Sequence, residues 1–229
     1  PLEGSNPIDD AAPDDELLKV ADSSAVDESL LGRPIARTPA ARFAERHGFL
    51  HQPEQVRFRV LDPAISVLGD ARDMTVTASA FESLRLPVST VIITENLVNF
   101  LALPERPDTL AIFGAGYGFS SLRDAAWLQD CEVLYWGDLD THGFRILDQL
   151  RSVHPPVSSV LMDEATLLAH RDAWGVEAPT SKAVLGRLTS EEARVYEGLQ
   201  AGSFGENVRL EQELIGWDWA LNRLKLDQR

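Results

Sequence analysis

The most regular feature of the sequence is a series of short apolar runs that alternate with helical patterns through its second half. Apolar, β-branched runs of about five residues are typical of buried parallel strands. The runs are Ser89–Thr94, Thr109–Phe113, Glu132–Trp136 and Ser158–Met162. The helical patterns that follow them are Glu95–Leu103, Phe119–Gln129, Thr141–Val153 and Glu164–Arg171. We therefore predict an α/β fold with a mainly parallel sheet and helices on both faces.

Two more strands and a helical turn are predicted before this series, and two helices after it. Val56–Asp62 and Met74–Ala78 alternate polar and apolar residues, which indicates strands at the edge of the sheet or its first strands. Phe81–Leu86 has the pattern of a helical turn that ends at Pro87. The final periodic segments, which predict a helical carboxy-terminal extension, are Ser190–Gln200 and Glu206–Lys225.

The first 52 residues differ in composition from the rest. Residues 1–32 hold nine acidic residues and one Lys, so they carry −8 of the chain's formal charge of −15. We interpret residues 1–52 as an acidic, partly disordered arm and linker from a truncated amino-terminal region, and residues 53–229 as the folded domain. A short helix is expected within Arg37–His51, from Pro39 onward, with Gly48 as its stop. His47 and His51 have the spacing of a helical metal pair, but Gly48 lies between them, so no zinc site is expected there.

Composition narrows the class of protein. Among 229 residues, 44% are apolar, which is enough for a sizeable core. The single cysteine, Cys131, excludes an internal disulfide, and its place beside a predicted buried strand indicates an inert thiol. No apolar run approaches the roughly 18 residues needed to span a bilayer, so we expect a cytoplasmic protein without a membrane partner.

The net charge of −15 and the absence of a basic cluster do not favour independent binding of nucleic acid. If nucleic acid is the substrate, metal ions or partner subunits must offset the repulsion.

Three carboxylates follow two of the predicted buried strands. Glu95 follows the strand that ends at Thr94, while Asp138 and Asp140 come just after the strand that ends at Trp136. Because ligand crevices of open α/β sheets lie at the carboxyl ends of the strands, the three side chains converge if these strands are close together. Such an oxygen-rich group is suited to Mg²⁺ or Mn²⁺ and to phosphoryl transfer.

A structural interpretation explains the same acids without a metal. Asp140 would cap the following helix, Asp138 would lie in a turn, and Glu95 would lie in the first turn of its helix. Both interpretations fit the pattern, although the repulsion between close carboxylates favours a bound cation.

Glycines after another strand suggest a different ligand. Gly114, Gly116 and Gly118 follow the strand that ends at Phe113, and they resemble part of a dinucleotide-binding fingerprint. Phe119 stands where a further glycine is needed, so a tight turn near the crevice is the favoured interpretation. In either case Gly114 and Gly116 are candidates for contacts with substrate.

Near the carboxyl end, Arg209 and Glu213 have the i, i+4 spacing of an exposed helical ion pair. In the same predicted helix, an apolar stripe faces the domain: Leu210, Leu214, Trp217, Leu221 and Leu224. Glu213 flanks this stripe, so it could point towards the crevice. Glu211 lies on the opposite border of the stripe.

The arrangement of Glu95 and Asp138-Leu139-Asp140 resembles the Toprim domain of topoisomerases, primases and several nucleases. A longer series of motifs is similar to the carboxy-terminal half of the Toprim nuclease subunit of Wadjet-type bacterial plasmid-defence systems, which implies a cytoplasmic bacterial protein. In order, these motifs are Arg57–Pro63, Ile93–Asn96, Ile112–Tyr117, Tyr135–Phe144, Leu161–Asp163 and Arg209–Glu213. The resemblance covers about residues 55 to 225.

This resemblance implies roles for particular residues. The metal-binding and catalytic acids would be Glu95, Asp138 and Asp140, with Glu95 also active in proton transfer. Mg²⁺ or Mn²⁺ would be the cofactor, and Glu211 or Glu213 would support the site. His142 and Arg145 are candidates for contact with phosphate, or else exposed residues at the start of a helix.

The resemblance also implies a reaction and partners. The subunit would cleave double-stranded plasmid DNA that a condensin-like motor of SMC and kleisin subunits presents, and it would be a homodimer in the full-length protein, as in topoisomerase VI. The tyrosines Tyr117, Tyr135 and Tyr196 have packing explanations, so water is the expected nucleophile. The alternatives are a catalytically silent Toprim module for dimerisation and docking, and an enzyme that binds a dinucleotide.

Overall fold

The computed structural model describes residues 53–114 and 119–224, which belong to the unit Pro53–Arg229. Several predicted features lie outside the described residues: the acidic arm, the helix within Arg37–His51, the pair His47 and His51, Gly116, Tyr117 and Gly118.

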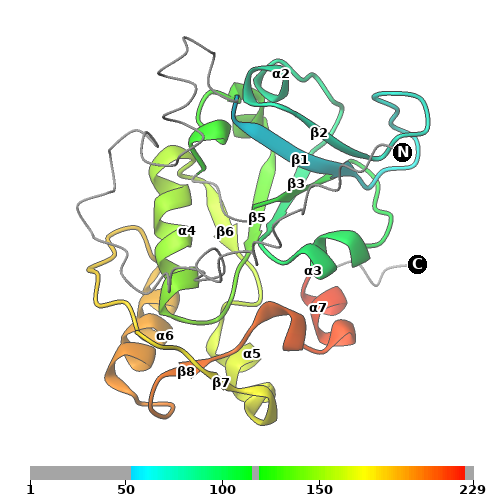
Figure 1. Ribbon diagram of the computed structural model, residues 1–229. Coiled ribbons are helices and arrows are strands. Elements are labelled where there is room, and N and C mark those ends of the chain that lie inside the picture. Colours follow the sequence, from blue (N-terminus) through cyan, green and yellow to red (C-terminus); the bar gives the residue numbers. More distant parts are fainter. Residues whose placement is uncertain (1–52, 115–118, 225–229) are drawn as a thin grey trace, which may run out of the picture. The chain divides into compact units, whose positions relative to one another are not determined.

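The described residues form a six-stranded sheet in the order β2-β1-β4-β3-β5-β6 (Figure 1). Its strands are β1 Gln55–Val60, β2 Asp73–Thr77, β3 Thr90–Thr94, β4 Thr109–Phe113, β5 Glu132–Trp136 and β6 Val157–Ser159. Strand β3 pairs in parallel with β4 and β5, and β5 pairs in parallel with β6. Strand β1 is antiparallel to both β4 and β2, so β1 and β2 form an antiparallel ribbon at one edge of the sheet. The predicted α/β fold with a mainly parallel sheet is confirmed.

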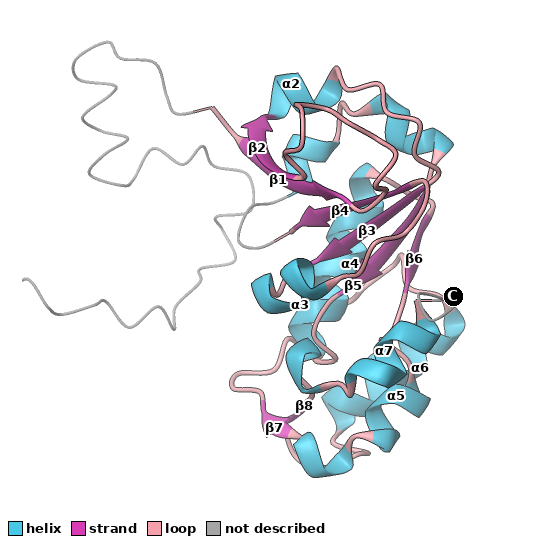
Figure 2. Cartoon of the chain, turned by 90° about the vertical axis from the view of Figure 1, so that its right-hand side faces the viewer, coloured by secondary structure: helices cyan, strands magenta, loops and turns pink. Residues whose placement is uncertain are grey.

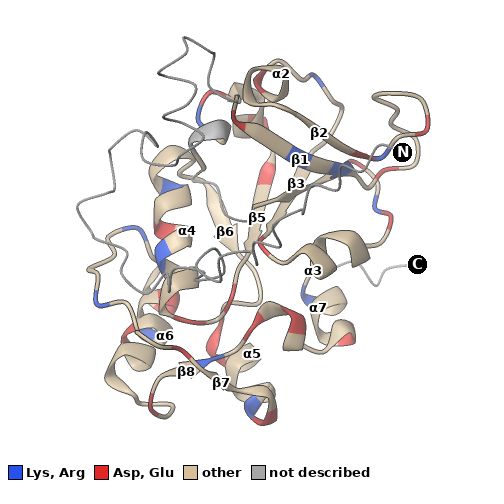
Figure 3. Ribbon diagram, in the orientation of Figure 1, with Lys and Arg blue, Asp and Glu red and all other residues tan. Residues whose placement is uncertain are grey.

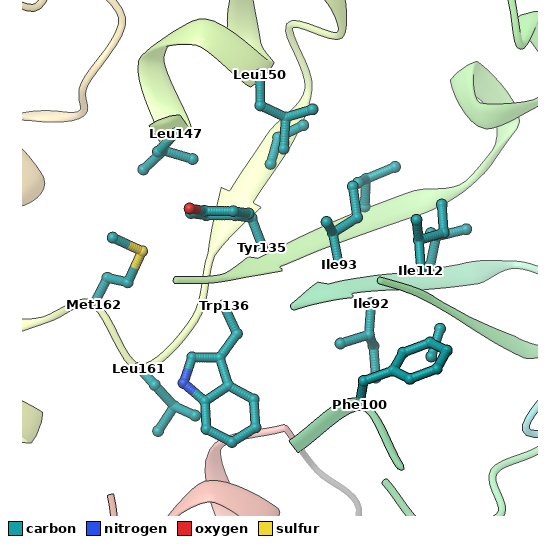
Figure 4. Packing of buried hydrophobic residues seen from close by; sticks show 14 of the residues in the cluster. Ile92, Ile93, Phe100, Ile112, Tyr135, Trp136, Leu147, Leu150, Leu161 and Met162 are labelled. Carbon is teal, nitrogen blue, oxygen red and sulfur yellow. The ribbon is translucent and has the colours of Figure 1, made fainter. Parts of the chain in front are cut away.

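The middle of the sheet is buried on both faces, as its continuous apolar runs require. All five residues of β3 are buried. Neighbouring residues of a strand point to opposite faces, and in Figure 4 Tyr135 lies with Leu147 on one side of the sheet while Trp136 lies on the other. The sheet therefore contributes to two apolar layers at once.

Helices cover both faces (Figure 2). Helix α4, Thr141–Val153, packs its buried residues Phe144, Leu147 and Leu150 on one face. On the same face Phe119 meets the ring of Tyr135. On the opposite face lie α3, Leu97–Ala102, and α7, Trp217–Arg223, and Trp217 of α7 stacks near Trp136. The other α-helices in the described residues are α2 Ala78–Glu82, α5 Glu164–Ala169 and α6 Ser190–Ala201.

The helix predicted for Phe119–Gln129 is wrong, because this segment forms two 3₁₀ helices, η2 Phe119–Leu122 and η3 Ala126–Asp130. Its buried apolar residues recur every third position, at Phe119, Leu122, Ala125 and Leu128. A repeat of three matches the 3.0 residues per turn of a 3₁₀ helix better than the 3.6 of an α-helix.

The continuous helix predicted for Glu206–Lys225 is also wrong. The chain there forms strand β8 Val208–Arg209, the 3₁₀ helix η5 Gln212–Leu214, and α7. Leu210 is extended and bonded to the backbone of Leu139, so it cannot join a helix. Leu214, predicted to lie in the apolar stripe, is 48% exposed. Strand β8 instead pairs with β7, Gly175–Val176.

Other predicted elements are shorter in the structure. Asn96 caps α3, so Glu95 lies outside the helix and not in its first turn. The predicted strand Ser158–Met162 shrinks to β6, and Leu161 has a φ of 65°, a left-handed conformation that does not continue a strand. Helix α5 ends at Ala169 and is followed by the 3₁₀ helix η4, Arg171–Ala173.

A buried ion pair joins α4 to α6. Arg151 Nη1 lies 2.6 Å from Glu192 Oε2, and both side chains are less than a tenth exposed. Ser159 of β6 donates a further hydrogen bond to Glu192. Burial alone would raise the pKa of Glu192, but the hydrogen bonds from Arg151 and Ser159 outweigh it and lower that pKa. Glu192 also completes the capping box of α6 with Thr189.

We predict that Glu192→Ala lowers the free energy of unfolding by about 3 kcal/mol, because it leaves the charge of Arg151 buried without its partner. The matched control is Glu191→Ala, an exposed neighbour in the same helical turn, which should cost no more than about 0.5 kcal/mol. Urea denaturation of both variants measures the difference. Equal losses in the two variants would contradict a structural role for the ion pair.

Candidate metal centre

The candidate site lies at the carboxyl ends of the three central strands. In the parallel register, Thr94 of β3 is level with Phe113 of β4 and Trp136 of β5. Glu95 follows Thr94 directly, and Asp138 follows β5 after one glycine. Convergence of the acids requires the strands before them to be close together. Strands β3 and β5 are direct neighbours in the sheet, so this condition is met.

The two carboxylate oxygens of Asp138 have different partners. Oδ1 accepts a hydrogen bond from the backbone N–H of Gln212 at 3.0 Å and lies 3.4 Å from Gln212 Nε2. Gln212 is held in turn by Thr94, whose hydroxyl donates to Gln212 Oε1 at 2.5 Å. Oδ2 accepts from Arg209 Nη2 at 2.7 Å. One oxygen is thus anchored to the fold, and the other meets a cation.

Asp140 divides its oxygens in the same way. Its Oδ1 accepts from the backbone N–H of Gly143 at 2.7 Å and so caps α4, as the structural interpretation of this residue predicts. Its Oδ2 lies 3.2 Å from Arg209 Nε. Burial raises the pKa of Asp140 to about 6, with smaller contributions from the charges of Glu177 and Asp138. The helix cap and the shared cation are compatible roles of one carboxylate.

Glu95 is the third acid of the group. Burial raises its pKa to about 7, and the negative charges of Asp138 and Asp140 add to the shift. The hydroxyl of Tyr135 donates a hydrogen bond to Glu95 Oε1. Tyr135 is completely buried, and its own pKa is raised well above the usual value, so it remains a donor. Glu95 is therefore a carboxyl group that exchanges a proton near neutral pH.

Arg209 is the cation that this acid group shares. Burial disfavours its charge, but the hydrogen bond and charge of Asp138, with the charges of Asp140 and Glu211, outweigh burial and raise its pKa. Glu211 Oε1 lies 3.3 Å from Arg209 Nη2. The predicted ion pair of Arg209 with Glu213 is wrong, because the backbone there is extended and Arg209 points at the strand ends instead.

Two glycines allow the close packing around these acids. A Cβ at Gly143 would lie 2.1 Å from the carbonyl oxygen of Asp138, so α4 could not start where it does with any larger residue. A Cβ at Gly137 would lie 2.4 Å from the Tyr135 hydroxyl, which passes over this glycine on its way to Glu95. Both positions require glycine for reasons of space.

A second group of ligand atoms adjoins the first. Atoms of Asp140, His142 and Glu177 all lie within 4.8 Å of one another, a spacing that could hold a metal ion. Glu177 is buried, and it accepts hydrogen bonds from the backbone N–H groups of Thr141 and His142 and from the Thr141 hydroxyl. His142 Nδ1 lies 2.5 Å from Glu177 Oε1. Glu177 therefore also braces the start of α4.

Sequence reasoning missed several residues of this site. Glu177 follows the two-residue strand β7 in a segment without periodicity, so no sequence signal marked it. The sequence pattern explains Tyr135 by packing alone, and it predicts for Arg209 only an exposed ion pair. Gln212 lies in the motif Arg209–Glu213, but the sequence predicts no role for it.

The remaining predicted site residues lie at different distances from the acids. Glu211 joins the group through Arg209, whereas Glu213 is exposed, and among the described residues no hydrogen bond or ion pair joins it to these acids. Arg145 has a buried Nε without a hydrogen-bond partner, and its charge acts on Tyr196 of α6. In the described part of the chain, no hydrogen bond or ion pair joins Arg145 to the acids.

Gly114 lies at the same edge of the sheet as the acids. Its N–H donates to the carbonyl of Thr94 at 2.9 Å. The helix after it is the short 3₁₀ helix η2 and not the α-helix whose N-terminus a dinucleotide pyrophosphate needs. This geometry does not favour the dinucleotide fingerprint.

Among the described residues, Asp140, His142 and Glu177 are the trio whose ligand atoms lie within 4.8 Å of one another, and Glu95 and Asp138 are not part of it. Asp138 Oδ2 and Asp140 Oδ2 both approach Arg209, and the charges of both acids act on Glu95. Carboxylate oxygens are the ligands that Mg²⁺ and Mn²⁺ prefer. Four acids, Glu95, Asp138, Asp140 and Glu211, surround the single Arg209, so the group has negative charge to offer to a further cation.

Outside this group, Lys and Arg are dispersed over many elements and do not gather on one (Figure 3). Among the described helices, none has the length and apolar character needed to cross a membrane.

The comparison with curated proteins found no match. Residues 48–224 match the family model described as Wadjet protein JetD, C-terminal. This match covers most of the chain and includes every residue of the acid group described above. The chain therefore belongs to the family of the carboxy-terminal domain of the Wadjet protein JetD.

Proposed function

We propose that this chain is the divalent-metal-dependent endonuclease part of its subunit and that it cleaves double-stranded plasmid DNA within an SMC-like defence complex. One observation carries the proposal. Asp138 and Asp140 each anchor one carboxylate oxygen to the fold and direct the other to Arg209, and the charges of both act on a third acid, Glu95. A capping role explains the anchored oxygens, but it does not explain why the two others share one cation.

The proposed chemistry assigns a role to each acid. Asp138 and Asp140 would hold Mg²⁺ or Mn²⁺, which when bound stabilises charge on the oxygens of a phosphodiester during its hydrolysis. Glu95, with a pKa of about 7, is suited to accept the proton of an attacking water at neutral pH. Tyr135 holds Glu95 in place through its hydroxyl.

Water is the proposed nucleophile, because the tyrosines in the described part of the chain are occupied. Tyr135 is buried against Glu95, and the hydroxyl of Tyr196 donates to the carbonyl of Ala183. His142 and Arg145, on the first turns of α4, are the proposed contacts for phosphate, together with the backbone at Gly114.

Family membership in a Wadjet component supports partner subunits, which we propose to be SMC and kleisin-like motor proteins. The formal charge of −15 supports a nuclease that receives DNA from such partners and does not hold it alone. We further propose a homodimer for the full-length protein.

A silent docking module is the second candidate. It is favoured by the exposed apolar residues of α3, which are Leu97, Val98 and Leu101. Arg209 would then neutralise the acids permanently. Isothermal titration of the full chain with Mn²⁺ separates the two functions, since a docking module need not bind the ion through Asp138.

We predict that Asp138→Asn lowers DNA cleavage by the reconstituted complex about a hundredfold or more, because it removes a charged metal ligand. The asparagine retains an oxygen that can accept from Gln212, so the fold should persist. Linearisation of a circular plasmid measures the effect, and Asp172→Asn, at an exposed position outside the site, is the matched control. Unchanged cleavage by Asp138→Asn would refute the proposed function.

The stability of the metal-free protein should depend on pH through Glu95. The folded-state pKa of Glu95 is raised from 4.5 to about 7, so its contribution to stability is complete below the unfolded value and is lost as pH rises through the folded one. Relative to Glu95→Gln, the wild type should therefore lose on the order of 2 kcal/mol of unfolding free energy between about pH 4.5 and about pH 7.5.

Urea denaturation in the presence of a chelator measures this difference. Parallel pH profiles for the wild type and Glu95→Gln would show that Glu95 titrates at its ordinary pKa in the folded chain.

A further inference from the structure

The side chain of Arg209 is fixed in the acid group by the backbone of its own segment. Leu139, between the two aspartates, donates its N–H to the carbonyl of Leu210 at 2.9 Å, and Leu210 donates back to Leu139 at 3.2 Å. This two-bond bridge brings the residue after β8 against the loop that carries both acids. Arg209 therefore reaches Asp138 and Asp140 as a consequence of strand pairing and not of a flexible surface contact.

The guanidinium of Arg209 pairs with the carboxylate oxygens that a metal ion would need as ligands. Oδ1 of each aspartate is committed to a backbone N–H, from Gln212 or from Gly143. The other oxygens, Asp138 Oδ2 and Asp140 Oδ2, lie 2.7 and 3.2 Å from nitrogen atoms of Arg209. A divalent ion and the guanidinium cannot both occupy this position.

The hydrogen bonding of Arg209 to the two aspartates is also incomplete. Its Nε is buried but makes no hydrogen bond of good geometry, although Asp140 Oδ2 lies near it. An ideal arginine–carboxylate pair has two parallel hydrogen bonds, and a buried donor without a partner is costly. The side chain is 33% exposed, so it has a path out of the site. These features suit a cation that is held in place but can be exchanged.

We propose that Arg209 is an internal counter-cation that competes with the divalent ion for Asp138 and Asp140 and leaves them when the ion binds. This inference rests on the proposed function, because it concerns the same acids. In the metal-free protein the positive charge of Arg209 offsets the repulsion between the two carboxylates and holds their oxygens in position. After exchange, the freed guanidinium lies at the rim of the site with its positive charge available for a DNA phosphate.

Titration of the full chain with Mn²⁺ tests the exchange. Removal of the competitor in Arg209→Gln should tighten Mn²⁺ binding about tenfold relative to the wild type. The Arg209→Gln protein in chelator should also melt at a lower temperature than the wild type, and Mn²⁺ should raise its melting temperature by more. Arg209→Lys, which retains the charge, should bind Mn²⁺ with an affinity closer to that of the wild type.

The matched control is Arg187→Gln, which removes an arginine paired with Asp148 outside the acid group and should leave Mn²⁺ binding unchanged. Wild-type binding that depends on Asp138, with equal or weaker binding by Arg209→Gln, would overturn the role of Arg209 and leave the metal site standing. Failure of every variant and of the wild type to bind Mn²⁺ would overturn the metal site itself, and with it the exchange.

A second measurement uses the wild-type protein, so it does not depend on the folding of Arg209→Gln. The NMR signal of the Arg209 Nε–H group can be assigned by its loss in Arg209→Lys. It should shift during titration with Mg²⁺ and saturate together with metal binding. An unchanged signal while Mg²⁺ binds would show that Arg209 does not leave the acids.

Discussion

The structure around the candidate site depends on the repulsion between carboxylates that the sheet brings together. Strands β3 and β5 are direct neighbours in parallel register, so Glu95 and Asp138 must emerge side by side. At an effective dielectric constant of about 20, two charges at 4 Å repel each other by about 4 kcal/mol. The fold responds in two ways: Glu95 holds its proton to a pKa of about 7, and Arg209 is placed between the two aspartates. A bound divalent ion would satisfy the same requirement.

Much of the local structure can be understood as support for this arrangement. Gly143 lets α4 begin directly on the carbonyl of Asp138, and Glu177 secures the first N–H groups of that helix. Gln212 connects Asp138 to Thr94 of the neighbouring strand. The acids are thus held by hydrogen bonds from three separate segments of the chain, which is the kind of support that a site needs if it is to keep its geometry when a ligand binds.

The sequence predicted the parts of this structure that depend on local periodicity. The buried strands and the position of Glu95, Asp138 and Asp140 at their ends followed from apolar runs that can only be buried on both faces. The 3₁₀ helices after Phe119 were missed because apolar residues three apart also fit a helix approximately. The segment after Val208 was missed because Leu210 pairs with Leu139, a contact between positions far apart in the chain that no local pattern reports. Arg209 reaches the site through that same pairing, and Glu177 reaches it through the pairing of β7 with β8.

The central claim is that Asp138 Oδ2 and Asp140 Oδ2 form one cation position that Arg209 and a metal ion occupy in turn. A crystal of the protein soaked in Mn²⁺, with the ion located by its anomalous scattering, tests this claim most directly. The account predicts an ion roughly 2.0 to 2.3 Å from both oxygens, with the guanidinium of Arg209 moved away from them. An ion bound elsewhere, or these two oxygens still paired with Arg209 at saturating Mn²⁺, would contradict it.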